Sequence, residues 1–251
     1  MDLKTANVIV TGAASGLGRC FATQFVQAGS KVLAFDVDKD GLESLKKELG
    51  DSLEFYAGSV AEEEDVKEAV AKAADAFGTV NGLVNNAGIF RDRLLARKNR
   101  KTGDIDTMSL EEWQLVIDVN LTGTFLCARE VATKMIESGD GGVIVNISSC
   151  SRHGNRGQSN YSATKAGVVA NAKLWGEELA RYGVRVGAVA PGFTDTPILQ
   201  GMRPDMLEKM LAQVPLRRAA KPEEIYQAVQ FIFECDYFTG RCIDVDGGIS
   251  L

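Results

Sequence analysis

Residues 11–18, TGAASGLG, follow the apolar run NVIV at 7–10 and precede a segment of helical period, RCFATQFVQAG. Three glycines in seven positions, between a strand and a helix, are typical of a turn that brings the backbone close to a phosphate. We expect Gly12 to form the tight bend, Gly16 to let the backbone approach a pyrophosphate and Gly18 to allow close helix packing. The turn therefore predicts a dinucleotide site, with a structural turn that binds no ligand as the alternative.

Asp36 ends the next apolar run, KVLAFD, 18 residues after Gly18. A carboxylate at this place binds both hydroxyls of an adenosine ribose and repels a 2′-phosphate, which favours NAD and disfavours NADP. The alternative is that Asp36 caps the helix predicted from DVDKDGLESL. No G-K-[ST] follows the turn, so the loop of a nucleotide triphosphatase is excluded.

Short β-branched runs alternate with segments of helical period along the whole chain. The predicted strands are 7–10, 31–37, 53–60, 82–86, 142–148, 185–190 and 241–247, and the clearest helical segments are 65–77, 111–138 and 162–182. Near-continuous apolar strands that alternate with helices predict an α/β fold, a doubly wound parallel sheet with helices on both faces. Without a linker or repeat over residues 1–251, we expect one domain.

The composition is that of an ordinary globular domain, with 45% hydrophobic and 25% charged residues among 251. The formal net charge of −6 argues against nucleic acid or an anionic membrane as a partner. The five cysteines are odd in number and unclustered, so we predict no metal site, no disulfide framework and small buried thiols of a reducing compartment. With no leader and no apolar run long enough to span a bilayer, we expect a cytoplasmic protein.

The stretch YSATK places Tyr161 and Lys165 on one face of a predicted helix, although such a pair also occurs on solvated helices. Reduction of a carbonyl needs a proton at the oxygen as hydride reaches the carbon, and a phenol with its ordinary pKa near 10 is a weak acid for this purpose. We expect Lys165 and a positive nicotinamide ring to lower the pKa of Tyr161 to about 7, which takes about 4 kcal/mol.

Seven motifs, in order along essentially the whole chain, resemble those of the short-chain dehydrogenase/reductase family. They are TGAASGLG (11–18), NNAG (85–88), Asn120 in DVNLTG, NISS (146–149), YSATK (161–165), PGF (191–193) and VDGG (245–248). The resemblance implies a single Rossmann-like domain with a seven-stranded sheet, assembled as a homotetramer or a dimer, of which we expect the tetramer. It also implies hydride transfer between NAD and an alcohol or carbonyl.

The resemblance assigns roles to individual residues. Tyr161 is the acid/base, Lys165 also binds the nicotinamide ribose, a serine hydroxyl holds the substrate oxygen, and Asn120 holds a water that relays protons. Contacts with the cofactor are implied for Gly12, Ser15, Gly16, Leu17, Gly18, Asp36, Val60, Asn86, Ala87, Gly88, Tyr161, Lys165, Pro191, Gly192, Thr194 and Thr196.

Two serines compete for the catalytic role. The family's usual separation of thirteen residues before the tyrosine selects Ser148, whereas alignment of the strand end NISS selects Ser149. Because consecutive strand residues point to opposite faces, only one can serve unless the strand has already ended. We choose Ser149.

Two segments are longer than ordinary connections. The first, residues 91–109, is named the arm here and carries six basic residues: Arg91, Arg93, Arg97, Lys98, Arg100 and Lys101. It is either a solvated loop or a site for the phosphates of coenzyme A or an acyl carrier protein. The second, residues 194–222, is named the lid and is rich in methionine, which suits a hydrophobic substrate or simple packing against the domain.

The arm and residues 211–248 are similar to the NAD-dependent 3-hydroxyacyl-CoA dehydrogenases and 3-oxoacyl reductases of this family. We therefore expect a 3-hydroxyacyl or 3-oxoacyl thioester as substrate. The alternatives are a dehydrogenase or carbonyl reductase for a hydrophobic secondary alcohol, a steroid or a sugar, and a catalytically silent NAD-binding sensor. The residues that the family uses for catalysis are all present, as Asn120, Ser149, Tyr161 and Lys165, which argues against a sensor that has lost its activity.

Overall fold

Seven parallel strands form a sheet in the order β3-β2-β1-β4-β7-β8-β9. This computed structural model describes residues 1–249 apart from the side chain of Ile198, so residues 250–251 of the predicted domain lie outside the described residues. The strands are β1 (Asn7–Thr11), β2 (Lys31–Asp36), β3 (Leu53–Ala57), β4 (Gly82–Asn85), β7 (Gly142–Ile147), β8 (Val184–Pro191) and β9 (Arg241–Val245). The predicted α/β sheet is confirmed, with small shifts at the strand ends.

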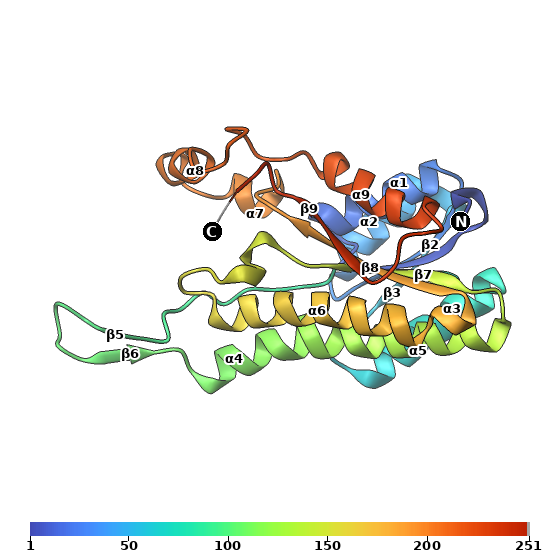
Figure 1. Cartoon of the computed structure of the whole chain (residues 1–251), viewed down its shortest axis with the longest axis horizontal. Coiled ribbons are helices and arrows are strands. Elements are labelled where there is room, and N and C mark those ends of the chain that lie inside the picture. Colours follow the sequence, from blue (N-terminus) through green and yellow to red (C-terminus); the bar gives the residue numbers. More distant parts are fainter. Residues whose placement is uncertain (250–251) are drawn as a thin grey trace.

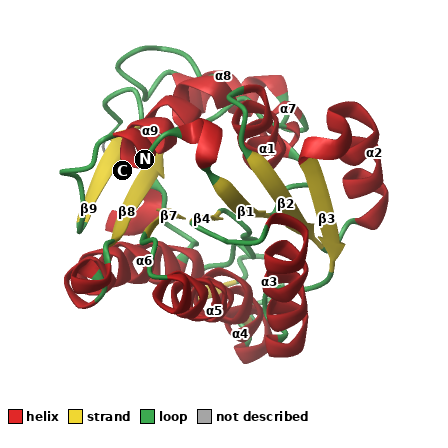
Figure 2. Cartoon of the chain, turned by 90° about the vertical axis from the view of Figure 1, so that its right-hand side faces the viewer, coloured by secondary structure: helices red, strands yellow, loops and turns green. Residues whose placement is uncertain are grey.

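Helices cover both faces of the sheet (Figure 2). One layer holds α1 (Gly16–Gln27), α2 (Lys39–Leu49) and α9 (Pro222–Glu234), and the other holds α3 (Glu63–Phe77), α5 (Gly123–Ser138) and α6 (Ser159–Glu178). The helix α4 (Leu110–Ile117) precedes α5, and the lid contains the short helices α7 (Pro197–Gln200) and α8 (Pro204–Leu211). Single 3₁₀ turns occur at Leu3–Thr5, Gly50–Ser52, Cys150–His153 and Ala180–Tyr182.

The alternation of side chains along each strand creates the two layers of the core. In β1, Val8 and Val10 pack with Phe21 of α1, whereas Ile9 between them packs with the helices of the opposite face. All three β1 side chains are at most 1% exposed, so each contributes about 1.5–3 kcal/mol of burial free energy. This two-sided burial explains why the strands read as continuous apolar runs.

The strand order reverses between β1 and β4. From β1 the chain first adds β2 and β3 on one side of the sheet, and then adds β4, β7, β8 and β9 on the other side. In open α/β sheets, the crevice beyond the carboxyl ends of the strands at such a point is the usual place for a ligand. Thr11, Asp36, Asn85 and Ile147 end four of these strands on that side.

The arm differs from the loop expected from its sequence. It contains the antiparallel strands β5 (Ala96–Lys98) and β6 (Ile105–Thr107), which form a hairpin that projects from the body of the molecule (Figure 1). Asn99 closes the turn, since its Oδ1 accepts hydrogen bonds from the N–H groups of Lys101 at 3.0 Å and Thr102 at 3.4 Å. The two strands have the sequences ARK and IDT. Neither shows the alternation of apolar and polar side chains from which a strand can be predicted.

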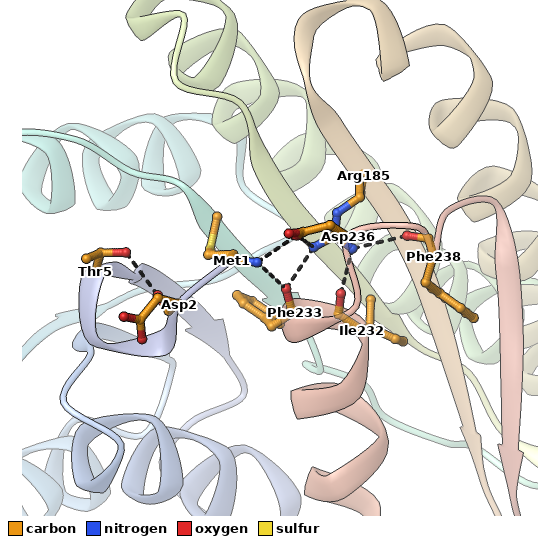
Figure 3. Close-up of polar contacts among 8 residues, drawn as sticks. All are labelled: Met1, Asp2, Thr5, Arg185, Ile232, Phe233, Asp236 and Phe238. Carbon is orange, nitrogen blue, oxygen red and sulfur yellow. Dashed lines mark hydrogen bonds and ion pairs between the residues drawn. The ribbon is translucent and has the colours of Figure 1, made fainter.

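The end of α9 is fastened to β8 by Arg185 (Figure 3). Its guanidinium donates hydrogen bonds to the carbonyl oxygens of Ile232 at 2.6 Å, Phe233 at 2.7 Å and Phe238 at 3.1 Å. The α-ammonium of Met1 donates to the Phe233 carbonyl at 3.0 Å and to the Asp236 carboxylate at 2.7 Å. Carbonyls that a helix end leaves without partners are thereby satisfied.

Candidate functional site

The glycine turn is closely packed, as its sequence predicts. Gly12 and Gly16 have φ angles of +66° and +54°, a conformation that favours glycine. A Cβ on Gly18 would collide with the carbonyl oxygen of Gly12, and a Cβ on Gly12 would lie 2.8 Å from Cα of Ala87. Glycine is therefore required at positions 12 and 18 for this packing, and the three glycines place no side chain over the backbone of the turn.

The N-terminus of α1 has the properties of an anion site. Ser15 precedes the helix and makes no side-chain hydrogen bond to its first turn, which also contains no acidic residue. The first N–H groups of a helix, here those of Gly16, Leu17 and Gly18, carry a partial positive charge. The turn therefore fits the pyrophosphate of a dinucleotide.

Asp36 lies at the end of β2 and braces the glycine turn. Its carboxylate accepts hydrogen bonds from the N–H groups of Ala14 at 2.9 Å and Asp38 at 3.0 Å. Asp38, not Asp36, caps α2, since its Oδ1 accepts from the Gly41 N–H at 3.1 Å. The capping alternative for Asp36 is therefore excluded, and its carboxylate retains acceptor capacity for ribose hydroxyls.

Thr11 joins the glycine turn to the NNAG motif, a role that the sequence reading missed. Its buried hydroxyl oxygen accepts from the N–H groups of Asn86 at 3.0 Å and Ala87 at 2.9 Å. The Asn86 amide donates in return to the carbonyl oxygens of Thr11 at 3.0 Å and Gly12 at 3.2 Å. The sequence did contain a signal for this role, because Thr11 is a polar residue at the last position of an otherwise apolar strand.

Asn120 lies in a π-helical turn, Asp118–Thr122, that interrupts the single helix expected over 111–138. Its side chain is fully buried, and it accepts from the Ile89 N–H and donates to the Ile89 carbonyl, each at 2.8 Å. A Cβ on Gly88 would lie 3.4 Å from both Asn120 Oδ1 and Lys165 Nζ. The turn thus places the Asn120 amide beside the lysine, and its water-relay role stays a prediction.

Tyr161 and Lys165 lie together on α6, where Nζ of Lys165 is 5.5 Å from the centre of the Tyr161 ring. Lys165 donates a hydrogen bond to the Ile147 carbonyl at 2.8 Å, and burial lowers the pKa of its ammonium to about 8. Burial raises the pKa of Tyr161 to about 12, against the opposing effect of the Ser149 hydroxyl. Without a nicotinamide ring beside the phenol, desolvation outweighs the groups that stabilise the phenolate, and the fall to about 7 expected with the cofactor bound stays a prediction.

The two candidate serines face different neighbours. Ser148 is 2% exposed, and its hydroxyl donates to the Lys165 carbonyl at 2.7 Å. Ser149 accepts from the Ser151 N–H at 3.1 Å and lies close enough to Tyr161 to act on the phenol. Because β7 ends at Ile147, the strand alternation no longer constrains either serine.

The start of the lid lies against the glycine turn. Gly192 follows β8, and a Cβ there would lie 2.7 Å from Cα of Asp246. Thr194 donates to the Gly192 carbonyl at 3.3 Å, and the Thr196 methyl carbon is 3.8 Å from where a Gly16 Cβ would be. Pro191, at the end of β8, is buried.

The side chain of Val60 is almost completely buried rather than exposed in the crevice at the carboxyl ends of the strands. Its side chain is 7% exposed and packs against Gly123, where a Cβ would lie 2.7 Å from Val60 Cγ2. The structure therefore gives the side chain a packing contact, and the cofactor contact predicted for Val60 stays a prediction.

The cysteines differ in part from the expectation. Cys127 and Cys150 are buried, but Cys20, Cys235 and Cys242 are only partly so. Within residues 1–249, no three His, Cys, Asp or Glu side chains gather as metal ligands. Over the same residues, no helix combines the length and the apolar character that a membrane crossing requires.

Comparisons with known proteins match nearly the whole chain. A family model described as enoyl-(acyl carrier protein) reductase matches residues 12–250. A protein of Thermotoga maritima named 3-oxoacyl-[acyl-carrier-protein] reductase FabG is 41% identical over 257 residues, which cover 100% of both chains. Proteins of the same name are 37% identical in Staphylococcus epidermidis, over 98% of this chain and 99% of the relative, and 36% identical in Vibrio cholerae, over 100% of both.

Proposed function

Since this chain belongs to the short-chain dehydrogenase/reductase family, we propose that it is an NADH-dependent reductase of 3-oxoacyl thioesters. The observation that carries the proposal is that the buried Lys165 lies 5.5 Å from the centre of the Tyr161 ring, while the Ser149 hydroxyl acts to lower the pKa of the same phenol. The name of its relatives, 3-oxoacyl-[acyl-carrier-protein] reductase, supports the substrate class.

The residues present fit a dinucleotide. The amides at the start of α1 would hold the pyrophosphate, Asp36 the adenosine ribose, and Lys165 the nicotinamide ribose. The carboxylate of Asp36 favours NAD over NADP, because a 2′-phosphate would bring a second negative charge beside it. When bound, the reduced nicotinamide supplies the hydride that reaches the carbonyl carbon.

Tyr161 supplies the proton. With a pKa of about 12, its phenol is protonated at neutral pH and can donate from Oη to the substrate oxygen. Lys165, whose Nζ lies 5.5 Å from the centre of the Tyr161 ring, is charged below about pH 8 and favours the resulting phenolate. The pKa of the phenol stays raised with this cation beside it, so the proton leaves as the substrate oxygen gains charge.

Ser149 and Asn120 position the reacting groups in this proposal. The Ser149 hydroxyl, on the Tyr161 side of the loop, donates to the substrate oxygen and keeps it in reach of the phenol. Asn120 fixes the backbone of Ile89 beside Gly88 and Lys165, and it holds the water through which the proton on Tyr161 is replaced.

A second candidate reaction is reduction of an enoyl thioester, because the matching family model bears that description. The two reactions differ in where a proton is needed. A ketone oxygen requires an acid in hydrogen-bonding reach, which Tyr161 and Ser149 provide together.

The test is NADH oxidation by the purified protein with acetoacetyl-CoA, run beside crotonyl-CoA and beside NADPH. The proposal expects turnover of the acetoacetyl thioester that prefers NADH at least tenfold in kcat/KM and leaves crotonyl-CoA unreduced. Reduction of crotonyl-CoA alone would replace the proposal with the enoyl reaction. If both thioesters are inert while NADH binds, a panel of ketones and secondary alcohols tests the alternative substrates.

A further inference from the structure

The chain at the end of β7 carries three consecutive residues that interact with Tyr161 and Lys165 on α6. The Ile147 carbonyl accepts a hydrogen bond from Lys165, and the Ser148 hydroxyl donates to the Lys165 carbonyl. Ser149 follows directly, and its hydroxyl acts on the Tyr161 phenol. A contact that fixes the loop after β7 therefore also fixes the position of the Ser149 hydroxyl.

A single turn of 3₁₀ helix, Cys150–His153, follows Ser149. The Ser149 carbonyl accepts a hydrogen bond from the Arg152 N–H at 3.1 Å, and the Ser149 hydroxyl accepts from the Ser151 N–H at 3.1 Å. Cys150 holds one side of the turn, because its side chain is buried in a small apolar cluster. The turn and the Ser149 side chain therefore form one hydrogen-bonded unit.

The side chain of Arg152 joins this turn to β9, the strand at the edge of the sheet (Figure 2). Its Nη1 and Nη2 donate to the two carboxylate oxygens of Asp244 at 2.6 Å and 3.0 Å. The Arg152 side chain is only 12% exposed. A bidentate pair with a largely buried guanidinium has a better defined geometry than an ordinary surface ion pair.

Asp244 is a firm anchor because its strand is bonded into the sheet. In the register of β8 and β9, Asp244 lies opposite Ala190. At the end of the pairing, the Gly192 N–H donates to the Val245 carbonyl at 2.9 Å. Arg152 therefore holds the turn after Ser149 against a strand of the sheet and not against another loop.

We propose that Arg152 and Asp244 are positioning residues, whose ion pair keeps the Ser149 hydroxyl in reach of the Tyr161 phenol and of the substrate oxygen. This role rests on the proposed function, because the oxygen concerned is that of the ketone. A misplacement of about 1 Å at a group that orients a reacting atom costs up to about 100-fold in rate. Arg152 acts through Ser149 and is not itself a catalytic residue.

Steady-state kinetics in two backgrounds test this role. Arg152→Met should lower kcat with acetoacetyl-CoA about tenfold, with KM for NADH within twofold of wild type. Because Arg152 acts through Ser149, the same change in a Ser149→Ala protein should leave the kcat of that protein within twofold. A tenfold loss in both backgrounds, or in neither, would overturn the proposal.

Changes to the partner show whether the ion pair itself is responsible. Asp244→Asn should lower kcat by a similar factor, and the double variant with Arg152→Met should be no slower than Arg152→Met alone. Arg152→Lys keeps the charge without the bidentate fork, so it should recover only part of the loss. Independent losses that multiply in the double variant would contradict a role through this pair.

The matched control is Arg185→Met, which removes another partly buried arginine that holds two elements of the fold together. At a temperature where the variant is folded, its kcat should stay within twofold of wild type. A loss of kcat equal to that of Arg152→Met would assign both losses to general destabilisation and reject the positioning role.

Hydrogen exchange of residues 149–154, followed by mass spectrometry, examines the turn without turnover. Exchange should be at least tenfold faster than wild type in Arg152→Met and in Asp244→Asn, and unchanged in Arg185→Met. Unchanged exchange in the first two variants would overturn the proposal. If wild-type protein reduces no ketone, the proposed function fails, while the exchange measurement still decides whether the ion pair fixes the turn.

Discussion

The ammonium group of Lys165 lies 5.5 Å from the centre of the Tyr161 ring, and its one described hydrogen bond goes to the Ile147 carbonyl at 2.8 Å. A buried cation with a single neutral acceptor is costly for stability, because desolvation is only partly repaid. The same cation is well placed to stabilise a phenolate. In the proposed function, the cost in stability of burying this cation accompanies its use in acid–base chemistry, a relation that is common at functional sites.

Replacing Lys165 with Met should increase stability and remove activity. The pKa of Lys165 falls from 10.5 to about 8 on folding, so its cost is present in full below pH 8. Between about pH 8 and 10.5 the unfolded state binds more protons, and the free energy of unfolding rises with pH. Lys165→Met should raise that free energy by about 1–2 kcal/mol at pH 7 and lower kcat at least 100-fold.

Urea unfolding at pH 7 and pH 10 measures this difference, which should shrink at the higher pH. A Lys165→Met protein that is less stable than wild type at pH 7 would contradict the buried-cation account. For wild-type protein, the rate of ketone reduction should fall as the pH passes through about 8, where Lys165 loses its charge.

The two serines should respond differently to the same change. Ser149→Ala removes the hydroxyl near Tyr161 and should lower kcat at least 100-fold; because the Ser151 N–H loses its acceptor, the free energy of unfolding should also fall by about 1 kcal/mol. Ser148→Ala leaves the Lys165 carbonyl without its side-chain donor and should lower the free energy of unfolding by about 1 kcal/mol. Steady-state kinetics and urea titrations of both variants decide the assignment, and the reverse pattern would transfer the catalytic role to Ser148.

Asp36→Ala should change both the cofactor preference and the glycine turn. Without the carboxylate, the 2′-phosphate is no longer repelled, so KM for NADPH should fall while KM for NADH rises at least tenfold. The Ala14 N–H loses its acceptor, which should lower the free energy of unfolding by about 1 kcal/mol. Unchanged NADH kinetics in this variant would remove Asp36 from the proposed cofactor site.

Arg185→Met should destabilise the fold without any role in the chemistry. The carbonyl oxygens of Ile232 and Phe238 lose their Arg185 donor, and that of Phe233 keeps only Met1 (Figure 3), which should lower the free energy of unfolding by about 2–4 kcal/mol. Asp236→Asn is the control, because this carboxylate is 81% exposed and its ion pairs with Arg185 and with the Met1 ammonium are therefore weak. Equal destabilisation by the two variants, measured in urea, would mean that the ion pair rather than the carbonyl contacts holds α9.

The strands and the glycine turn were predictable because local rules determine them. Continuous β-branched runs are required by two-sided burial, and Gly12 and Gly18 are required by the close approach of Ala87 and the turn carbonyl. Tyr161 and Lys165 share a helix face at any i, i+4 spacing, so their proximity also follows from sequence.

The remaining features depend on tertiary contacts. The hairpin of the arm rests on a turn at Asn99 and on the pair of Arg97 with Asp106, neither of which has a hydrophobic pattern. The raised pKa of Tyr161 arises from burial, which a sequence does not display. The arm also contacts the loop before α6, where the Arg93 N–H donates to the Gly157 carbonyl at 2.7 Å; this contact depends on how the loop folds, so the sequence alone could not predict it.

The most direct test of the account is the effect of Tyr161→Phe on NADH oxidation with acetoacetyl-CoA, with NADH affinity measured separately by fluorescence. The variant keeps the aromatic ring over Lys165 and removes only the proton donor. The account predicts a fall in kcat of about 1,000-fold with NADH affinity within twofold of wild type. A variant that retains more than a tenth of wild-type kcat would show that another group delivers the proton.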